Sequence, residues 1–421
     1  MDLIAELEWR GLLYDASEGV RDALAAGPVT GYIGFDPTAA SLHVGSLLPI
    51  LLLARLQRAG HLPIALVGGG TGLIGDPSGK TQERMLLTLE QVDVNLAGIR
   101  AQLERFLDFH APRNPARIVN NADWLRPLEL IPFLRDVGKH FTVNYMVAKE
   151  SVKRRLEGDE GISFTEFSYM LLMAYDYVVL FDRFTCTLQM GGSDQWGNIT
   201  AGMDLIRKLR GGKAHGIVSP LVTTSAGTKF GKSEAGTIWL DAKLTSPFRF
   251  YQFWLNVDDR DVVRYLKFFT FKTRDEIDEL ARAAVDRPDR REAQRALART
   301  VTAMVHGDDH VARAERAAGV LFSDDLASAS VDDVLMVLED APSSDIVMPP
   351  DGLTVVDLLT ATKLAASKSE AVRLVKGNGV YVNNVRANDE RARLTTAQAI
   401  GGQVFVLRKG RRDQHVVRIT R

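Results

Sequence analysis

The 421-residue chain has a single cysteine, Cys186, and no apolar run long enough to cross a membrane. One cysteine excludes a disulfide within the chain and a zinc cluster built from cysteines. The longest apolar run, Leu47 to Ala54, falls far short of the roughly 20 residues that a membrane helix requires. The first residues, MDLIAELEWRG, lack the basic and apolar segments of a secretory signal. We therefore expect the protein in the cytoplasm.

Charge of one sign is not in excess over the whole chain, whose net charge is −1, but it is unevenly spread. Residues 351–421 carry 13 Lys and Arg against 6 Asp and Glu, a net charge of +7, so the remainder sums to −8. Residues 323–351 hold eight acidic residues and no Lys or Arg. A basic module behind an acidic segment is typical of a polyanion-binding appendage. From charge alone, a solvated basic face fits equally well.

The pattern of elements predicts an α/β fold. The length predicts two or three domains, and 46% hydrophobic and 25% charged residues are typical of a globular protein. Strand-type and helix-type segments alternate in the order Gly31–Phe35, His43–Ala59, Leu62–Val67, Leu86–Phe109, Arg117–Val119 and, after a mostly helical stretch, Thr187–Met190. Such alternation predicts a Rossmann-like, doubly wound parallel sheet with ligand sites at the carboxyl ends of its strands. Residues 247–322 read as helical throughout.

The tail reads as a small α+β unit. Thr354–Thr360 has a helical pattern, and Ser367 with Glu370 fits a capping box that opens a helix over Glu370–Lys376. Two glycines then end the helix, and Val380–Val382 begins a strand.

Two segments about 180 residues apart point to phosphate chemistry. In GFDPTAASLHVGS (Gly34 to Ser46), a helix begins at a His-x-Gly turn, and a helix N-terminus attracts phosphate. His43 and Thr38 are able to donate to phosphoryl oxygens, and Gly45 leaves room for a base. In GTKFGKSE (Gly227 to Glu234), Lys229 and Lys232 stand three apart on a glycine-bearing loop that suits a departing pyrophosphate. Read alone, the first is also a helix cap and the second a surface loop.

The loop GGGTGLIGDPSGK admits two other interpretations. Gly70 to Gly75 spells the dinucleotide fingerprint, which invites an NAD-dependent dehydrogenase, but the acidic residue about twenty positions on, Asp93, falls in a helical pattern. GDPSGKT nearly spells a phosphate-binding P-loop, with three residues between Gly75 and Gly79 where four are required.

Two further segments indicate a small-molecule pocket. Tyr169, Met173 and Asp176 recur at helical spacing and share one face, which suits the reading of a substrate hydroxyl. A structural ion pair is the alternative for Asp176. In GGSDQWGN (Gly191 to Asn198), adjacent glycines permit backbone contact with a sugar beside the acceptor Asp194.

Together these segments resemble the HIGH and KMSKS signatures of class I aminoacyl-tRNA synthetases. The residues around them resemble those of bacterial-type tyrosyl-tRNA synthetases, and this resemblance extends from about Trp9 to the C-terminus. The resemblance implies ATP as a substrate with Mg²⁺ on its phosphates. It implies catalytic roles for Thr38, His43, Lys80, Arg84, Lys229, Lys232 and Ser233. It implies tyrosine contacts from Tyr32, Asp36, Asp76, Tyr169, Asp176 and Gln195, and ATP contacts from His43, Gly45, Ser46, Gly192, Asp194 and Lys232. The family's pattern usually has histidine at position 46, glutamine at 173 and often cysteine at 33, where this chain has Ser46, Met173 and Ile33.

The tail run SKSEAVRLVKGNGVYVNN resembles the S4 RNA-binding module, which implies tRNA contacts from Lys368, Arg373, Lys376 and Arg386. The domains expected are a catalytic nucleotide-binding domain at 1–219, the lysine loop with a helical domain at 220–322, an acidic linker at 323–351 and an S4-like domain at 352–421. The function expected is tyrosine activation by ATP and transfer to tRNA(Tyr) by a homodimer. An RNA-binding protein that has lost aminoacylation is the alternative.

Overall fold

A computed structural model describes residues 1–76, 87–158, 161–225, 227, 230–233, 236–321, 326, 329–339, 341–410 and 413–420, with the backbone alone at 151, 232, 233, 320 and 321. The chain divides into two compact units. The first comprises Met1–Thr245 and Phe253–Val305, and the second comprises Ser246–Gln252 and His306–Arg421. The predicted domain boundaries at 219, 322 and 351 stay a prediction.

The first unit is built on a six-stranded sheet in the order β1-β6-β5-β2-β3-β4, in which only β1 runs antiparallel to its neighbour. Its strands are β1 (Asp15–Ala16), β2 (Thr30–Phe35), β3 (Leu62–Val67), β4 (Arg117–Asn120), β5 (Cys186–Gly192) and β6 (His215–Ser219). The strand order reverses beside β2, because β3 and β4 follow on one side while β5 and β6 lie on the other. This confirms the predicted doubly wound sheet and places its switch point between β2 and β5.

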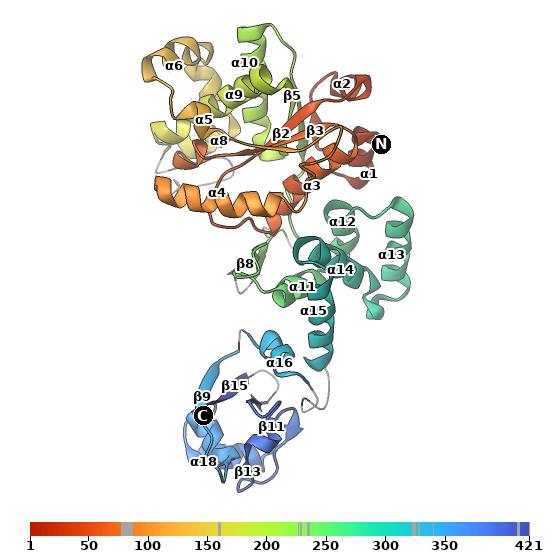
Figure 1. The fold of residues 1–421 in the computed structure, drawn as a ribbon, viewed down its shortest axis with the longest axis vertical. Helices are drawn as coiled ribbons and strands as arrows, with labels where there is room; N and C mark the ends of the chain where they lie inside the picture. Colours follow the sequence, from red (N-terminus) through yellow and green to blue (C-terminus); the bar gives the residue numbers. More distant parts are fainter. Residues whose placement is uncertain are drawn as a thin grey trace. The chain divides into compact units, whose positions relative to one another are not determined.

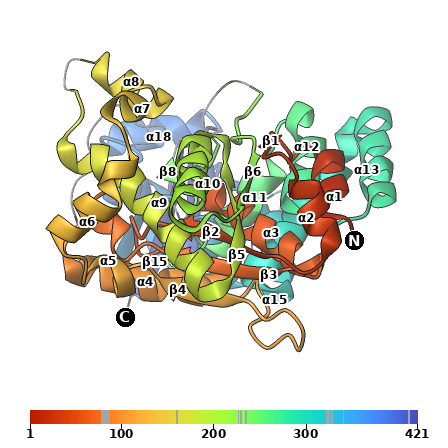
Figure 2. The same ribbon diagram turned by 90° about the horizontal axis from the view of Figure 1, so that it is seen from above.

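Helices cover both faces of this sheet (Figures 1 and 2). The helices before and within the sheet region are α1 (Leu3–Arg10), α2 (Val20–Ala26), α3 (Val44–Arg58), α4 (Leu89–Leu103), α5 (Ala122–Leu125), α6 (Leu130–Asp136), α7 (Val143–Val147), α8 (Glu150–Leu156), α9 (Phe164–Phe184) and α10 (Trp196–Arg210). In Figure 1, α9 and α10 lie above the strands and α3 and α4 below them. A core of side chains from α9, α10, β2 and β3 fills the upper side, with Tyr32, Ala174 and Tyr177 fully buried.

The predicted strands and helices of this unit are confirmed with small shifts at their ends. The strand expected at Leu62–Val67 has those bounds in β3. The helix expected at His43–Ala59 is α3, for which His43 is the N-cap. The periodicity over Leu86–Phe109 corresponds to the shorter α4, because Thr88 and Gln91 form a capping box that begins the helix at Leu89.

The helical segment expected at 247–322 is also confirmed. It consists of α11 (Pro247–Leu255), α12 (Asp259–Phe269), α13 (Arg274–Asp286), α14 (Glu292–His306) and α15 (Asp308–Leu321). In the first unit, two buried arginines join α12 to the rest. Arg10 on α1 and Arg55 on α3 both donate to the carbonyl oxygen of Thr270, at 3.1 and 2.9 Å, just after α12 ends. These bonds satisfy backbone acceptors that the end of a helix leaves unpaired.

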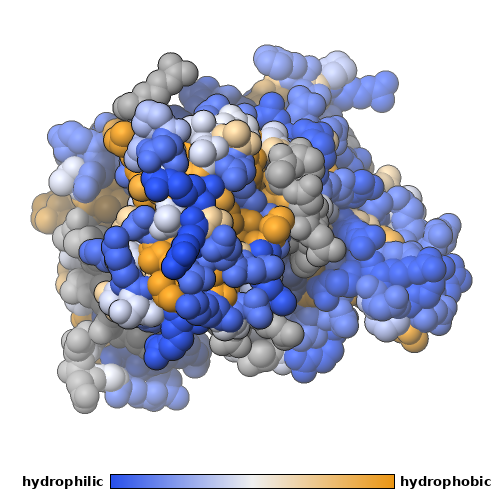
Figure 3. Space-filling view, turned by 90° about the horizontal axis from the view of Figure 1, so that it is seen from below, coloured by the Kyte–Doolittle hydropathy of each residue, from blue (hydrophilic) through white to orange (hydrophobic). Residues whose placement is uncertain are grey.

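The second unit carries a five-stranded sheet in the order β12-β11-β14-β15-β9. Its elements are α16 (Val331–Val337), β9 (Ser343–Val347), β10 (Leu353–Thr354), α17 (Val355–Ala361), α18 (Lys368–Lys376), β11 (Val380–Val382), β12 (Val385–Arg386), β13 (Arg393–Leu394), β14 (Val404–Lys409) and β15 (Asp413–Thr420). Helices α17 and α18 pack on one face of the sheet and α16 on the other. Figure 3 shows a largely hydrophilic face of the molecule with apolar residues in small patches.

Two expectations about the tail need correction. The segment 323–351, expected as an acidic linker, contributes α16 and also β9, which pairs with β15. Helix α18 begins at Lys368 instead of Glu370, since Ser367 caps it by accepting from Glu370 N at 3.2 Å. The Glu370 carboxylate accepts from Ala366 N at 2.8 Å instead of Ser367 N, so the reciprocal bond of a capping box is not made. Over the described ranges, no helix is both long and apolar enough to span a bilayer.

Candidate functional site

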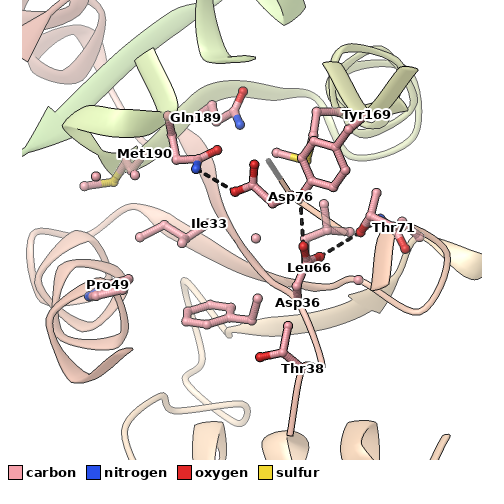
Figure 4. A pocket seen from close by; sticks show the side chains of 18 residues that line it. Ile33, Asp36, Thr38, Pro49, Leu66, Thr71, Asp76, Tyr169, Gln189 and Met190 are labelled. Atoms are coloured by element: carbon pink, nitrogen blue, oxygen red, sulfur yellow. Dashed lines mark hydrogen bonds between the residues drawn. The ribbon is translucent and has the colours of Figure 1, made fainter. Parts of the chain in front are cut away.

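A pocket of about 250 Å³ opens at the switch point of the first sheet (Figure 4). The carboxyl ends of β2 and β5 and the loop after β3 form most of its wall, which is where a doubly wound sheet binds ligands. It is lined by Ile33, Gly34, Phe35, Asp36, Thr38, Pro49, Leu66, Gly68, Thr71, Asp76, Asn121, Tyr169, Met173, Gln189, Met190, Gly191, Gly192 and Gln195. Predicted site residues from four separate segments of the chain therefore meet here.

Asp36 and Asp76 are held in this pocket by neutral donors. Figure 4 shows Tyr169 and Thr71 turned toward Asp36, whose two carboxylate oxygens accept from the two hydroxyls, each at 2.8 Å. Asp76 Oδ2 accepts from Gln195 Nε2 at 2.9 Å. Burial and the nearby Asp36 raise the pKa of Tyr169 well above its usual value, so its hydroxyl stays protonated. A carboxylate has about four lone-pair sites, so each can accept from more than one donor.

Asp176 lies next to the pocket and is fully buried. Its carboxylate accepts from Trp124 Nε1 at 2.7 Å and from Asn121 Nδ2 at 2.9 Å. Burial raises its pKa to about 7, although these two bonds act in the opposite direction. The Tyr32 hydroxyl is close enough for Asp176 to raise its pKa further, and it has no hydrogen-bond partner among the described residues. A buried hydroxyl of this kind is satisfied when a polar ligand reaches it.

Asn121, Trp124 and Thr71 were missed by sequence reasoning. Asn121 and Trp124 follow β4 in the run NNADWL, and polar residues just after a parallel strand were the available signal. Gln189 was missed as well. It is 3% exposed, it lines the pocket, and its Oε1 has no partner in the described part of the chain.

The first helical turn of α3 holds the His43 side chain in a defined state. His43 Nδ1 accepts from Gly45 N at 2.9 Å, so the neutral ring carries its proton on Nε2. A Cβ on Gly45 would lie 2.6 Å from the His43 imidazole, so the His43 ring already occupies the space that the glycine leaves. The imidazole therefore caps the helix with Nδ1 and carries its proton on Nε2. Ser46 lies in the first turn of α3.

In a dinucleotide fold the glycine-rich loop after the strand opens directly into an α-helix. Here Thr71–Leu73 forms a single 3₁₀ turn, and among the described residues the next helix is α4, which begins at Leu89 and contains Asp93. Gly68 is needed because a Cβ there would lie 2.1 Å from Asp36 Oδ1. Lys80 and Arg84 lie outside the described residues.

The two signature segments meet in the fold. Val44 N donates to Ile238 O at 3.0 Å, Leu240 N donates to Leu42 O at 2.9 Å, and His43 forms a β-bridge with Trp239. Lys232 and Ser233 form β7, which pairs with β8 (Gly236–Thr237), and nothing is described of their side chains. Lys229 lies outside the described residues. The structure thus brings residues 238–240, and with them Gly231 of the second segment, to the N-terminus of α3.

The GGSDQWGN run joins β5 to α10. Gly192 ends β5, residues Ser193–Gln195 form a 3₁₀ turn, and Trp196 begins α10. A Cβ on Gly192 would lie 2.7 Å from Asp194 Oδ1, which places that carboxylate at the pocket edge. Gln195 is fixed through Oε1, which accepts from Asn198 Nδ2 at 2.9 Å.

The predicted basic residues of the second unit divide into two pairs. Lys368 and Lys376 form ion pairs with Asp357 and Glu390, at 2.9 and 3.2 Å. Arg373 and Arg386 make no ion pair with a carboxylate in the described part of the unit, and Arg386 instead donates to the Tyr381 hydroxyl at 3.1 Å.

Comparison with known proteins gives concordant matches. Residues 24–323 match the family of class I tRNA synthetases (W and Y), and residues 333–417 match the SYY-like C-terminal domain of tyrosine–tRNA ligases. The chain is 57% identical to the tyrosine–tRNA ligase of Roseiflexus castenholzii, over 99% of both chains. It is 51% identical to that of Geobacillus stearothermophilus, over 99% of this chain and 100% of the relative. A C-terminally truncated mitochondrial tyrosyl-tRNA synthetase of Aspergillus nidulans superposes with a TM-score of 0.68 at 33% identity, covering 76% of this chain and 94% of that one.

Proposed function

This chain belongs to the tyrosyl-tRNA synthetases of class I, and on that premise we propose that it activates L-tyrosine with ATP and transfers it to tRNA(Tyr). The tyrosine carboxylate attacks the α-phosphorus of ATP in line, which forms tyrosyl-adenylate and releases pyrophosphate. The tyrosyl group then passes to the 3′-terminal ribose of the tRNA. The carboxylate is already ionised, so catalysis rests on positioning and on charge stabilisation.

The observation that carries the choice of tyrosine is the buried pair of Tyr32 and Asp176. In our proposal both groups bond the phenol hydroxyl of the substrate, which satisfies the unpartnered Tyr32 hydroxyl. Asn121 and Trp124 hold the Asp176 carboxylate in place for this contact. A site that bonds a substrate hydroxyl rejects the analogue that lacks it. The rejection of phenylalanine by tyrosyl-tRNA synthetases is a well-known example of this rule.

The opposite end of the pocket suits the amino acid's charged groups. Tyr169 and Asp76 would receive the substrate ammonium, supported by Asp36, which already accepts from Tyr169. Gln195, bonded to Asp76, would contact the carboxylate. Met173 is unable to bond the ammonium, and Gln189 with its unpartnered Oε1 lines the same pocket.

ATP is proposed to lie across the N-terminus of α3. His43 Nε2–H and the Thr38 hydroxyl would donate to phosphoryl oxygens, while Gly45 and Ser46 lie along the nucleotide. Asp194 and Gly192 would contact the ribose. The pyrophosphate would meet cationic and hydroxyl groups from two segments of the chain, Lys80, Arg84, Lys229, Lys232 and Ser233. Mg²⁺ would accompany the phosphates, which suits an ion that prefers phosphate oxygens and water.

We propose that residues 351–421 bind tRNA through Lys368, Arg373, Lys376 and Arg386. The net charge of +7 over these residues supports a polyanionic partner. We also propose a homodimer in the cytoplasm. Large apolar side chains of α6, α7 and the start of α9 support a second copy as partner, since Ile131, Val143 and Phe164 are 72, 65 and 77% exposed. Sedimentation of an Ile131→Glu, Phe164→Glu double variant would test this, with monomers expected.

The proposed activity is tested by ATP–pyrophosphate exchange. Exchange should depend on tyrosine, and its kcat/KM should be at least about 10⁴-fold lower with phenylalanine. Phenylalanine leaves the buried groups that bond the substrate hydroxyl without a partner. Absence of exchange together with retained tRNA binding would instead favour an RNA-binding protein without aminoacylation. Equal exchange with both amino acids would contradict the assignment of tyrosine.

A further inference from the structure

Phe230 stands between the two lysines of the second signature and is buried, with 5% of its surface exposed. Its ring packs against aromatic rings of α11 and α12. The ring centroids are 5.0 Å from Tyr265, 5.2 Å from Phe269, 5.6 Å from Phe253 and 5.7 Å from Trp254. The contact with Phe269 is stacked, at an interplanar angle of 17°. Burial of an aromatic ring among aromatic rings fixes the backbone that carries it.

Helix α12 also holds the segment that leads into the lysine loop. The buried carboxylate of Asp261 accepts from Ser225 N at 2.8 Å. The Thr223 carbonyl oxygen accepts from the Tyr265 hydroxyl at 3.1 Å and from Arg264. At its other end, α12 is joined to α3 through Arg55, which donates to Phe268 O at 2.9 Å. One helix thus supports both signature segments.

Gly231, directly after Phe230, meets the first turn of α3. Its φ of +88° favours glycine, and a Cβ at this position would lie 3.0 Å from Val44 Cγ2 and 3.5 Å from the backbone nitrogen of Gly45. Gly231 O accepts from Ile238 N at 3.2 Å, and Ile238 O accepts from Val44 N. Phe230 is therefore held by α12, and the adjacent Gly231 lies against α3.

From these contacts we infer that Phe230 is a positioning residue for adenylate formation. Its ring fixes the point from which the chain leads to Lys229 on one side and to Lys232 on the other. A lysine side chain is long and rotates freely, so the charge it brings to a leaving pyrophosphate depends on where its backbone is held. Loss of the ring should therefore weaken transition-state stabilisation by the lysines and leave tyrosine binding unchanged. This inference rests on the proposed function.

A double-mutant cycle between Phe230 and Lys232 tests the inference. Phe230→Ala should lower the single-turnover rate of adenylate formation by about 10-fold or more, with the dissociation constant of tyrosine unchanged. In a Lys232→Ala background the same change should lower the rate by clearly less than in the wild type, because the part of the effect that acts through Lys232 is already absent. Phe230→Met, which refills the space with a flexible apolar chain, should recover most of the rate.

Phe253→Ala is the matched control, because it removes a ring of the same aromatic cluster that stands on α11 and not on the loop. It should lower the unfolding temperature and leave the rate within about twofold of wild type. Equal losses for Phe230→Ala in both backgrounds, or a loss of tyrosine affinity that matches the loss of rate, would overturn the inference. If the wild type itself gave no tyrosine-dependent exchange, the proposed function would fail and the cycle would have no rate to compare.

Discussion

The pocket of the first unit and the basic surface of the second unit hold their charged groups in opposite ways. Asp176 is fully buried and bonded to two neutral donors, whereas the side chains of Lys368 and Lys376 are 73 and 63% exposed and paired with carboxylates. A buried, bonded charge recognises a ligand by fixed geometry and is little affected by salt. An exposed charge attracts any polyanion and is screened by salt. The two regions should therefore respond to mutation, salt and pH in different ways.

The largest effect is expected at the buried side of this comparison. Asp176→Asn keeps the shape of the side chain but removes the charge that accepts the substrate hydroxyl, so kcat/KM for tyrosine activation should fall by about 10³-fold. The amide also places a donor against Asn121 or Trp124, and the unfolding temperature should fall with it. Exchange kinetics and thermal unfolding measure the two losses. Wild-type exchange by a folded Asp176→Asn protein would contradict the role of this carboxylate.

Removal of the second unit's sheet should separate the two regions. The cut belongs after Leu321, because β9 and α16 pack with the C-terminal sheet and a cut at Asp351 would leave them without partners. The protein lacking residues 322–421 should keep pyrophosphate exchange within about twofold and lose about 100-fold or more in the kcat/KM of tRNA charging. Normal charging by the truncated protein would show that the basic residues of the tail are exposed to solvent without binding tRNA.

The buried carboxylate should also make the stability of the first unit depend on pH. Burial raises the Asp176 pKa to about 7 in the folded protein, whereas an exposed aspartate titrates near 3.9. Between about pH 4 and 7 the folded state holds a proton that the unfolded state has released, so the free energy of unfolding decreases as pH rises. The contribution is at most about 1.4 kcal/mol per pH unit. Urea unfolding at several pH values across this range should give a free energy of unfolding that falls more steeply with pH in the wild type than in Asp176→Asn. Equal pH dependence in the two proteins would refute the raised pKa of Asp176.

The smallest effects are expected among the exposed cations. Arg386→Gln should weaken tRNA binding about three- to tenfold at low salt and reduce the salt dependence of binding by about one counterion. Lys368→Gln should weaken it less than about twofold, because this ammonium is already paired with Asp357. Binding titrations at several salt concentrations compare these matched single-charge changes. A larger loss for Lys368→Gln would show that its ion pair opens on binding.

Much of the fold follows from local pattern. The apolar run Leu62–Val67 became β3 with those bounds, and the helical spacing of Tyr169, Met173 and Asp176 placed all three on the buried side of α9. Helix ends were less predictable, as α18 shows, because Glu370 reached Ala366 instead of the residue expected. Such ends depend on single hydrogen bonds that compete with close alternatives.

The sequence alone determined the family, the order of the elements and the residues that bear charge, because these depend on residue type and spacing along the chain. Only the tertiary structure decided that Asn121 and Trp124 bond Asp176 and that Phe230 enters an aromatic cluster on α11 and α12. It also decided that Lys368 pairs with Asp357, whereas Arg386 bonds the Tyr381 hydroxyl and forms no ion pair with a described carboxylate. The partners in these contacts are separated by 52 and 55 residues in the pocket and by 11 residues at Lys368. Local propensity carries no information about which distant group fills a cavity or meets a charge, because packing and hydrogen-bond satisfaction are settled only when the whole chain is folded.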